Sequence, residues 1–161
     1  MLVKIHRVKG IVLDTNILIL LAVGSFDQNQ ISKFKRTQNF ELTDFLLLRD
    51  FVSEFKKIIV TPNVLTELSN LTDKWNKQTT NYRFFKYLAE LIKKLEERTF
   101  DSRFLADKTA FVKLGLTDCS LSELGQEQLL VLTDDLELAH FLETQKLPCL
   151  NFNHIRTHLL T

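Results

Sequence analysis

Short, uninterrupted apolar runs recur along the chain, and each is bounded by polar residues or turn signals. Runs this short that show no helical period predict β-strands. Because they also lack alternating polar positions, they are typical of strands that are covered on both faces, as in a parallel sheet. The predicted strands lie at residues 10–14, 57–60, 129–133 and 148–152.

Longer segments between these strands predict helices. The strongest signal covers residues 76–98, where Phe84, Leu88, Leu91 and Leu95 recur at spacings of three or four and mark one apolar helix face. Another amphipathic helix is indicated by Phe45, Leu48, Val52 and Phe55, and further helices are predicted at residues 16–23, 62–71, 103–114, 117–124, 135–146 and 153–160.

Glycine, proline and polar clusters indicate where the helices begin and end. Thr61 and Pro62 suit the N-cap and the first turn of the helix that follows them. We interpret Gly115 and Gly125 as the stop signals of the helices that precede them. The polar segment 25–40 is predicted to be a loop or an irregular helix.

Strands that alternate with helices indicate an α/β fold. Such a pattern predicts a short parallel sheet of four to five strands flanked by helices. The chain has 161 residues with only 4 Gly and 2 Pro, so no Pro/Gly-rich linker divides it and residues 1–161 are predicted to form a single domain. In sheets of this kind, functional groups gather just beyond the carboxyl ends of the strands.

The composition limits the classes of protein. A net charge of +1 gives no strong overall field for nucleic acid, so such a site has to be a local patch. The 2 cysteines and the absence of a signal-like start favour reduced thiols in the cytoplasm, and no apolar run is long enough to span a bilayer. The 13 Phe exceed what one core needs, so we expect some at a homodimer interface; the alternative is that all serve the core.

Acidic residues occupy the predicted strand ends. Asp14 ends the first strand, and Asp134 and Asp135 follow the third. Glu67 lies in the helix after the second strand, and Asp118 begins the short helix near residue 117. Clustered carboxylates repel one another, and oxygen ligands suit Mg²⁺ or Mn²⁺. Taken singly, each acid also fits a helix cap or a solvated face, and that interpretation stays open.

Four acid-bearing motifs follow one another along the chain: IVLDTNILI at residues 11–19, TPNVLTELSN at 61–70, LGLTDCSL at 114–121 and VLTDDLELAHF at 131–141. Together they resemble the PIN domain, a family that includes the toxin nucleases of bacterial toxin–antitoxin pairs. Residues 28–40 and 76–98 are longer than in a minimal toxin of that family. The resemblance implies a three-layer PIN-like fold and a Mg²⁺- or Mn²⁺-dependent endoribonuclease, with RNA as substrate and a protein antitoxin as partner.

The resemblance also implies roles for single residues. Asp14, Asp118 and Asp135 would be the main metal carboxylates, and Asp134 is the neighbouring candidate for the fourth acid. Glu67 would complete the catalytic set and orient the attacking water, which in the family reaches phosphorus without a covalent enzyme intermediate. Supporting hydrogen bonds to the acids or to ligated water would come from Thr15, Asn16 and Thr133.

Basic and aromatic residues are candidates for contacts with RNA. Lys33, Lys35 and Arg36 follow the first helix and can hold phosphates at the mouth of the site. Trp75 and Tyr82 can stack on bases. For each set, a solvated face or ordinary packing is the alternative. The track of Lys33, Lys35 and Arg36 can be extended by a further basic set, for which a solvated face with ordinary helix pairs is the alternative: Arg83, Lys86, Lys93, Lys94 and Arg98.

Two rival classes of function compete with the nuclease. An aspartate-nucleophile phosphatase needs a second Asp two residues after the first, where this chain has Asn16. A receiver domain needs a Lys at a late strand end, and residues 150–152 contain none. A catalytically inactive PIN-like module for RNA binding or scaffolding stays as the second alternative, and the presence of all four acids argues against it.

Overall fold

The sheet is five-stranded and all-parallel, in a computed structural model that describes residues 9–73 and 78–158. The strand order is β3-β2-β1-β4-β5. The strands are β1 (Ile11–Leu13), β2 (Ile58–Val60), β3 (Glu96–Glu97), β4 (Leu130–Thr133) and β5 (Cys149–Asn151). The helices are α2 (Thr15–Phe26), η1 (Gln28–Gln30), α3 (Leu42–Ser53), α4 (Pro62–Thr72), α5 (Gln78–Ile92), α6 (Ser102–Ala106), α7 (Phe111–Gln126), α8 (Leu136–Thr144) and α9 (Phe152–His158).

The α/β class and the parallel sheet are confirmed, and each of the four predicted strands differs from its observed counterpart by at most one residue at either end. The central strand is β1, where Val12 pairs with Ile59 on one side and Val131 on the other. All three residues of β1 are fully buried. A strand buried on both faces and both edges has no polar position, which explains why an unbroken apolar run predicts it.

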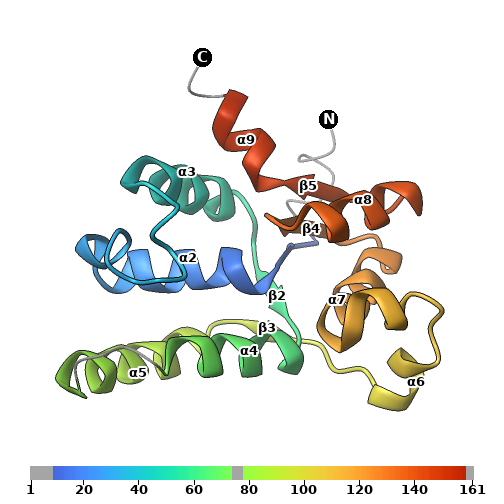
Figure 1. The fold of residues 1–161 in the computed structure, drawn as a ribbon, viewed down its shortest axis with the longest axis horizontal. Coiled ribbons are helices and arrows are strands. Elements are labelled where there is room, and N and C mark those ends of the chain that lie inside the picture. Colours follow the sequence, from blue (N-terminus) through green and yellow to red (C-terminus); the bar gives the residue numbers. More distant parts are fainter. Residues whose placement is uncertain (1–8, 74–77, 159–161) are drawn as a thin grey trace.

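Helices cover the sheet on both sides, which gives a three-layer arrangement (Figure 1). Figure 1 shows α2, α3, α4 and α5 side by side to the left of the strands, with α6, α7 and α8 to the right. The helix α2 lies in the middle of its group, and Ile17 to Gly24 are all buried. Its Gly24 is required by packing, because a Cβ there would lie 2.3 Å from the ring of Phe45. In the described part of the chain, no helix is both long and apolar enough to cross a membrane.

The predicted helix 76–98 is wrong at its C-terminal end. The helix α5 stops at Ile92, and Glu96–Glu97 form the edge strand β3 beside β2. Two acidic residues carry no apolar signal for a strand, and charges are typical of sheet edges. The Glu96 carboxylate binds Lys57 Nζ (2.7 Å) and Arg98 Nε (3.0 Å), and the Arg98 N–H donates to the carbonyl of Val60. The predicted start of this helix lies outside the described residues.

The two glycines read as helix stops behave differently. Gly115 has φ +74° and interrupts the helical geometry, so the chain kinks there within α7. Gly125 does not stop its helix, which continues to Gln126, and the left-handed residue that follows is Gln128. The predicted helix 103–114 is also broken, because α6 ends at Ala106 and α7 begins at Phe111.

The phenylalanines serve the core of this chain. Six are buried, and five more are partly buried and packed against the core cluster. Phe111 is half-buried, and only Phe104 is exposed, at 46 %, with Lys108 Nζ 4.1 Å from its ring centre. A role in the core therefore accounts for nearly all of the Phe residues. Self-association stays a prediction, and the abundance of Phe no longer supports it.

Candidate active site at the carboxyl ends of the strands

Four acidic side chains from four separate elements line one cleft at the carboxyl ends of the strands. Asp14 follows β1 and Asp135 follows β4, whereas Glu67 lies in α4 and Asp118 in α7. All four border a cleft of about 370 Å³. The sequence placed Asp14 and Asp135 at strand ends and Glu67 and Asp118 in helices, and the structure brings all four to one place.

Asp14 is fixed by two short hydrogen bonds at the start of α2. The Thr15 N–H donates to Oδ1 and the Thr133 hydroxyl donates to Oδ2, each at 2.5 Å. Asp14 is also the N-cap of α2, so capping and a role in the cleft coexist. The side chain is only 7 % exposed, and burial raises its pKa to about 6 although both hydrogen bonds lower it. The carboxylate is thus held in place while its charge is poorly solvated.

Glu67 is oriented by two threonine hydroxyls from different elements. Thr15 Oγ1 donates to Oε2 at 2.9 Å, and Thr117 Oγ1 donates to Oε1 in a shorter contact. Thr15 was predicted as a supporting residue, and its contact with an acid is confirmed. Thr117 was not among the predicted supporting residues, because nothing in the sequence indicates that its hydroxyl meets Glu67 in α4. Glu67 therefore has both oxygens engaged and a fixed direction.

Asp118 is the acid with the least compensation. Burial and the repulsion from Asp14, Asp135 and Glu67 raise its pKa to about 7. No residue in the described ranges donates a hydrogen bond to its carboxylate. Its position is nevertheless fixed, since the neighbouring Ser120 is fully buried with its hydroxyl 2.9 Å from Thr61 Oγ1 at the end of β2.

The adjacent acids Asp134 and Asp135 lie in different places. Asp135 lines the cleft, and its Oδ1 accepts the N–H groups of Glu137 (2.7 Å) and Leu138 (3.1 Å) as the cap of α8. Asp134 lines a neighbouring pocket instead. Burial raises its pKa, a hydrogen bond from the Asn16 side chain lowers it, and its Oδ1 has no hydrogen-bond partner within the described residues. The geometry favours Asp135 over Asp134 as the fourth acid of the cleft.

The donor set of the cleft fits Mg²⁺ or Mn²⁺ in its chemistry. It consists of carboxylate oxygens, hydroxyls and an amide, which hard divalent cations prefer. Burial is the main cause of the raised pKa of Asp118, and repulsion from the other carboxylates adds to it. In this conformation, however, no three His, Cys, Asp or Glu side chains of the described residues lie close enough to hold one ion. Repulsion acts over longer distances than ligation, and Mg²⁺ commonly takes only one or two carboxylates, with water as its other ligands.

The three basic residues after α2 take up different positions. Arg36 lines both the acidic cleft and the neighbouring pocket, and Lys35 lines only that pocket. Lys33 lines neither and lies near Asp27, whose pKa it helps to lower. Of these three residues, only Lys35 and Arg36 therefore occupy positions that fit a role at the site.

The basic track along α5 and beyond borders neither the cleft nor the pocket. Two of its members lie close to aromatic rings: Arg83 is 6.0 Å from the Phe26 ring centre, and Lys86 is 5.4 Å from that of Tyr82. Lys93 pairs with Glu90 at 2.7 Å. The ordinary interpretation, surface pairs, accounts for these residues. Trp75 lies outside the described residues.

No family model and no curated protein matches the sequence.

Proposed function

We propose that the protein is a metal-dependent endoribonuclease of the PIN type that hydrolyses phosphodiester bonds at the acidic cleft. One observation carries the proposal: Asp14, Glu67, Asp118 and Asp135 come from four elements and share one cleft, where Asp118 is poorly compensated. Folding brings these like charges together at a cost in free energy, which a bound cation offsets. The resemblance of the same four motifs to the PIN domain supports the choice of a nuclease.

The residues of the cleft would have different roles in the reaction. Asp14, Asp118 and Asp135 would hold the ion, and Glu67, oriented by two hydroxyls, would position the attacking water. Arg36 borders the same cleft and can neutralise a phosphate oxygen. When bound, Mg²⁺ or Mn²⁺ supplies the activation of water and the neutralisation of charge at phosphorus.

A catalytically inactive RNA-binding or scaffold module is the second candidate. It is favoured by the absence, within the described residues, of three side chains close enough to ligate one ion. The two candidates differ in a simple respect: an inactive module has no use for the cluster of carboxylates, and a divalent ion would not bind there.

The test combines metal binding and cleavage. Titration calorimetry with Mn²⁺ is expected to show binding that Asp14→Asn removes, and a labelled RNA is expected to be cut in Mn²⁺ but not in EDTA. Full cleavage in EDTA overturns the metal mechanism. RNA binding without Mn²⁺ binding or cleavage favours the inactive module.

The assembly of the protein belongs to the same proposal. The resemblance implies a protein antitoxin, and we retain a homodimer and a cytoplasmic location as predictions. Light scattering at micromolar concentration tests the dimer, and a strictly monomeric mass contradicts it. The toxin role predicts that expression of the protein arrests growth. Co-expression of a small protein encoded by an adjacent gene is expected to relieve the arrest.

A further inference from the structure

A second pocket adjoins the acidic cleft and has the opposite character. Its volume is about 390 Å³, and it shares Asn16 and Arg36 with the cleft, so the two hollows are adjacent. Lys35, Asn39 and Arg156 also line it. Where the cleft presents acids with one arginine at its border, this pocket presents three cations and several amide groups.

One wall of the pocket is the turn segment, residues 27–41, which links α2 to α3. Every third side chain of this segment points inward, since Ile31, Phe34, Thr37 and Phe40 are all buried. The Thr37 hydroxyl donates to the carbonyl of Ile31 at 2.7 Å and fixes the turns. The residues between these anchors are exposed, and they include Lys35 and Arg36. The segment is therefore a fixed support for its basic side chains, although it contains little regular structure.

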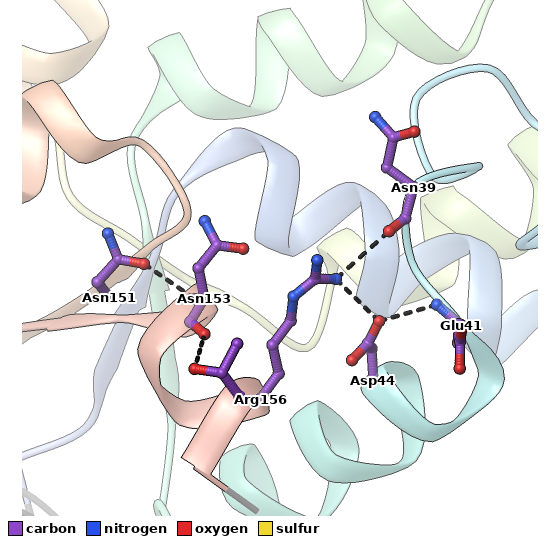
Figure 2. A network of polar contacts seen from close by, with 7 residues as sticks. Asn39, Glu41, Asp44, Asn151, Asn153 and Arg156 are labelled. Carbon is purple, nitrogen blue, oxygen red and sulfur yellow. Dashed lines mark hydrogen bonds and ion pairs between the residues drawn. The ribbon is translucent and has the colours of Figure 1, made fainter. Parts of the chain in front are cut away.

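The other wall is α9, which is tied to the turn segment by Arg156. Figure 2 shows its guanidinium between the Asn39 carbonyl and the Asp44 carboxylate. The Arg156 Nη1 lies 3.3 Å from the carbonyl oxygen and 2.9 Å from Asp44 Oδ2. The guanidinium also lies 5.2 Å from the ring centre of Phe40. Only one of its nitrogens makes these hydrogen bonds, so further N–H donors remain for a ligand.

Asp134 is the one acid among the described residues that line the pocket. Arg156 is close enough to lower the pKa of Asp134, and the backbone carbonyl of Asp134 accepts a hydrogen bond from the Asn153 side-chain amide at 3.0 Å. Arg156 is also paired with Asp44, so these two acids leave one excess positive charge on the three cations of the pocket, with amide donors beside them. Lysine, arginine and amide donors are the groups that bind phosphate oxygens of nucleic acid without reading its sequence.

We propose that this pocket binds a backbone phosphate of the RNA strand, adjacent to the phosphate that lies at the acidic cleft. The proposal rests on the proposed nuclease function for the identity of the strand. It assigns to Lys35 and Arg156 a binding role, and it gives the strand a direction across the protein: from the acids, past Asn16 and Arg36, towards α9.

Binding is measured by fluorescence anisotropy with a labelled single-stranded RNA of about ten nucleotides, in EDTA so that no cleavage occurs. Lys35→Gln is expected to weaken binding about three- to tenfold and to reduce the slope of log affinity against log salt by about 0.7. Lys33→Gln is the matched control, because it removes the same charge from the same exposed segment but lines neither hollow. It is expected to leave the affinity within about twofold of wild type.

Equal losses in the two variants, or none in either, would overturn the pocket, since only the overall charge would then matter. A labelled single nucleotide that binds as tightly as the RNA, with the same dependence on Lys35, would overturn the strand in favour of a small ligand. Cleavage and binding test the nuclease and the pocket independently. Metal-dependent cleavage together with unchanged binding by Lys35→Gln removes only the pocket, and Lys35-dependent binding without cleavage removes only the nuclease.

Discussion

The acidic cleft and the basic pocket meet at Asn16 and Arg36, yet the chain builds them by different means. The acids of the cleft stand at strand ends or on helices packed against the sheet, and hydroxyl groups or helix N–H groups hold all of them but Asp118. The cations of the pocket stand on a turn segment and on the short helix α9. Both supports are fixed, but three of the four acids are held directly by hydrogen bonds, whereas Lys35 is an exposed side chain suited to a phosphate outside the proposed reacting centre. We therefore expect changes in the cleft to affect turnover and changes in the pocket to affect binding.

The largest effect is expected from Asp14→Asn. Asn keeps the shape and can still cap α2, but it cannot replace an anionic ligand, so cleavage in Mn²⁺ is expected to fall at least about a thousandfold. RNA binding in EDTA is expected to be retained or improved, because a negative charge is removed. Thermal melts in EDTA serve as the control for folding. Substantial cleavage by the folded variant would show that Asp14 is not part of the active site. It would also contradict the assignment of turnover to the acidic cleft.

A second prediction concerns stability against pH in metal-free buffer. The folded pKa values of Asp14 and Asp118 are raised above the ordinary value of 3.8, so the folded state binds more protons than the unfolded state between about pH 4 and pH 7. The contribution of these two residues to the free energy of unfolding therefore decreases as the pH rises through that range. We expect a value roughly 1–3 kcal/mol lower at pH 8 than at pH 5, from urea denaturation.

Two controls make this prediction specific to the cleft. Asp118→Asn is expected to flatten the pH dependence, and saturating Mn²⁺ is expected to restore stability at pH 8. A free energy of unfolding that rises from pH 5 to pH 8 in EDTA would show that the acids are better compensated than the geometry indicates.

A smaller effect is expected from Thr117→Val. The substitution removes the hydroxyl that donates to Glu67 Oε1 and leaves Thr15 as its one remaining hydroxyl donor among the described residues. Turnover is expected to fall about tenfold with little change in KM, since Glu67 loses orientation and not charge. Thr157→Val is a matched control, because that hydroxyl bonds only backbone carbonyls of its own helix. Equal turnover in the two variants would contradict a positioning role for Thr117.

The smallest effect is expected in the cleavage kinetics of Lys35→Gln. Loss of a phosphate contact outside the reacting centre is expected to raise KM about three- to tenfold, with a smaller change in kcat. Steady-state kinetics on the same RNA used for binding provide the measurement. A dominant fall in kcat would place Lys35 with the groups of the cleft and remove the distinction between the two regions.

The parts of this molecule that follow from the sequence are those governed by the sheet. The strands are buried on both faces, so apolar runs predict them, and their ends locate Asp14 and Asp135. The edge strand at Glu96 escaped prediction because it is short, acidic and stabilised by partners such as Lys57, far away in the sequence. The contact of Thr117 with Glu67 and the pairing of Arg156 with Asp44 also depend on long-range packing. Local patterns contain no information about which distant residue a hydroxyl or a guanidinium meets.

The hydroxyl of Thr133 has a fixed orientation, and this gives the site a spectroscopic marker. Its oxygen accepts the N–H of Asp135 at 2.9 Å, so its single proton is directed to Asp14 Oδ2, and the residue is fully buried. A hydroxyl proton locked in this way exchanges slowly with solvent. It can therefore be followed as a resolved resonance by nuclear magnetic resonance. Because the proton lies between the ends of β1 and β4, its chemical shift reports the ionisation of Asp14 directly, without any substitution in the cleft.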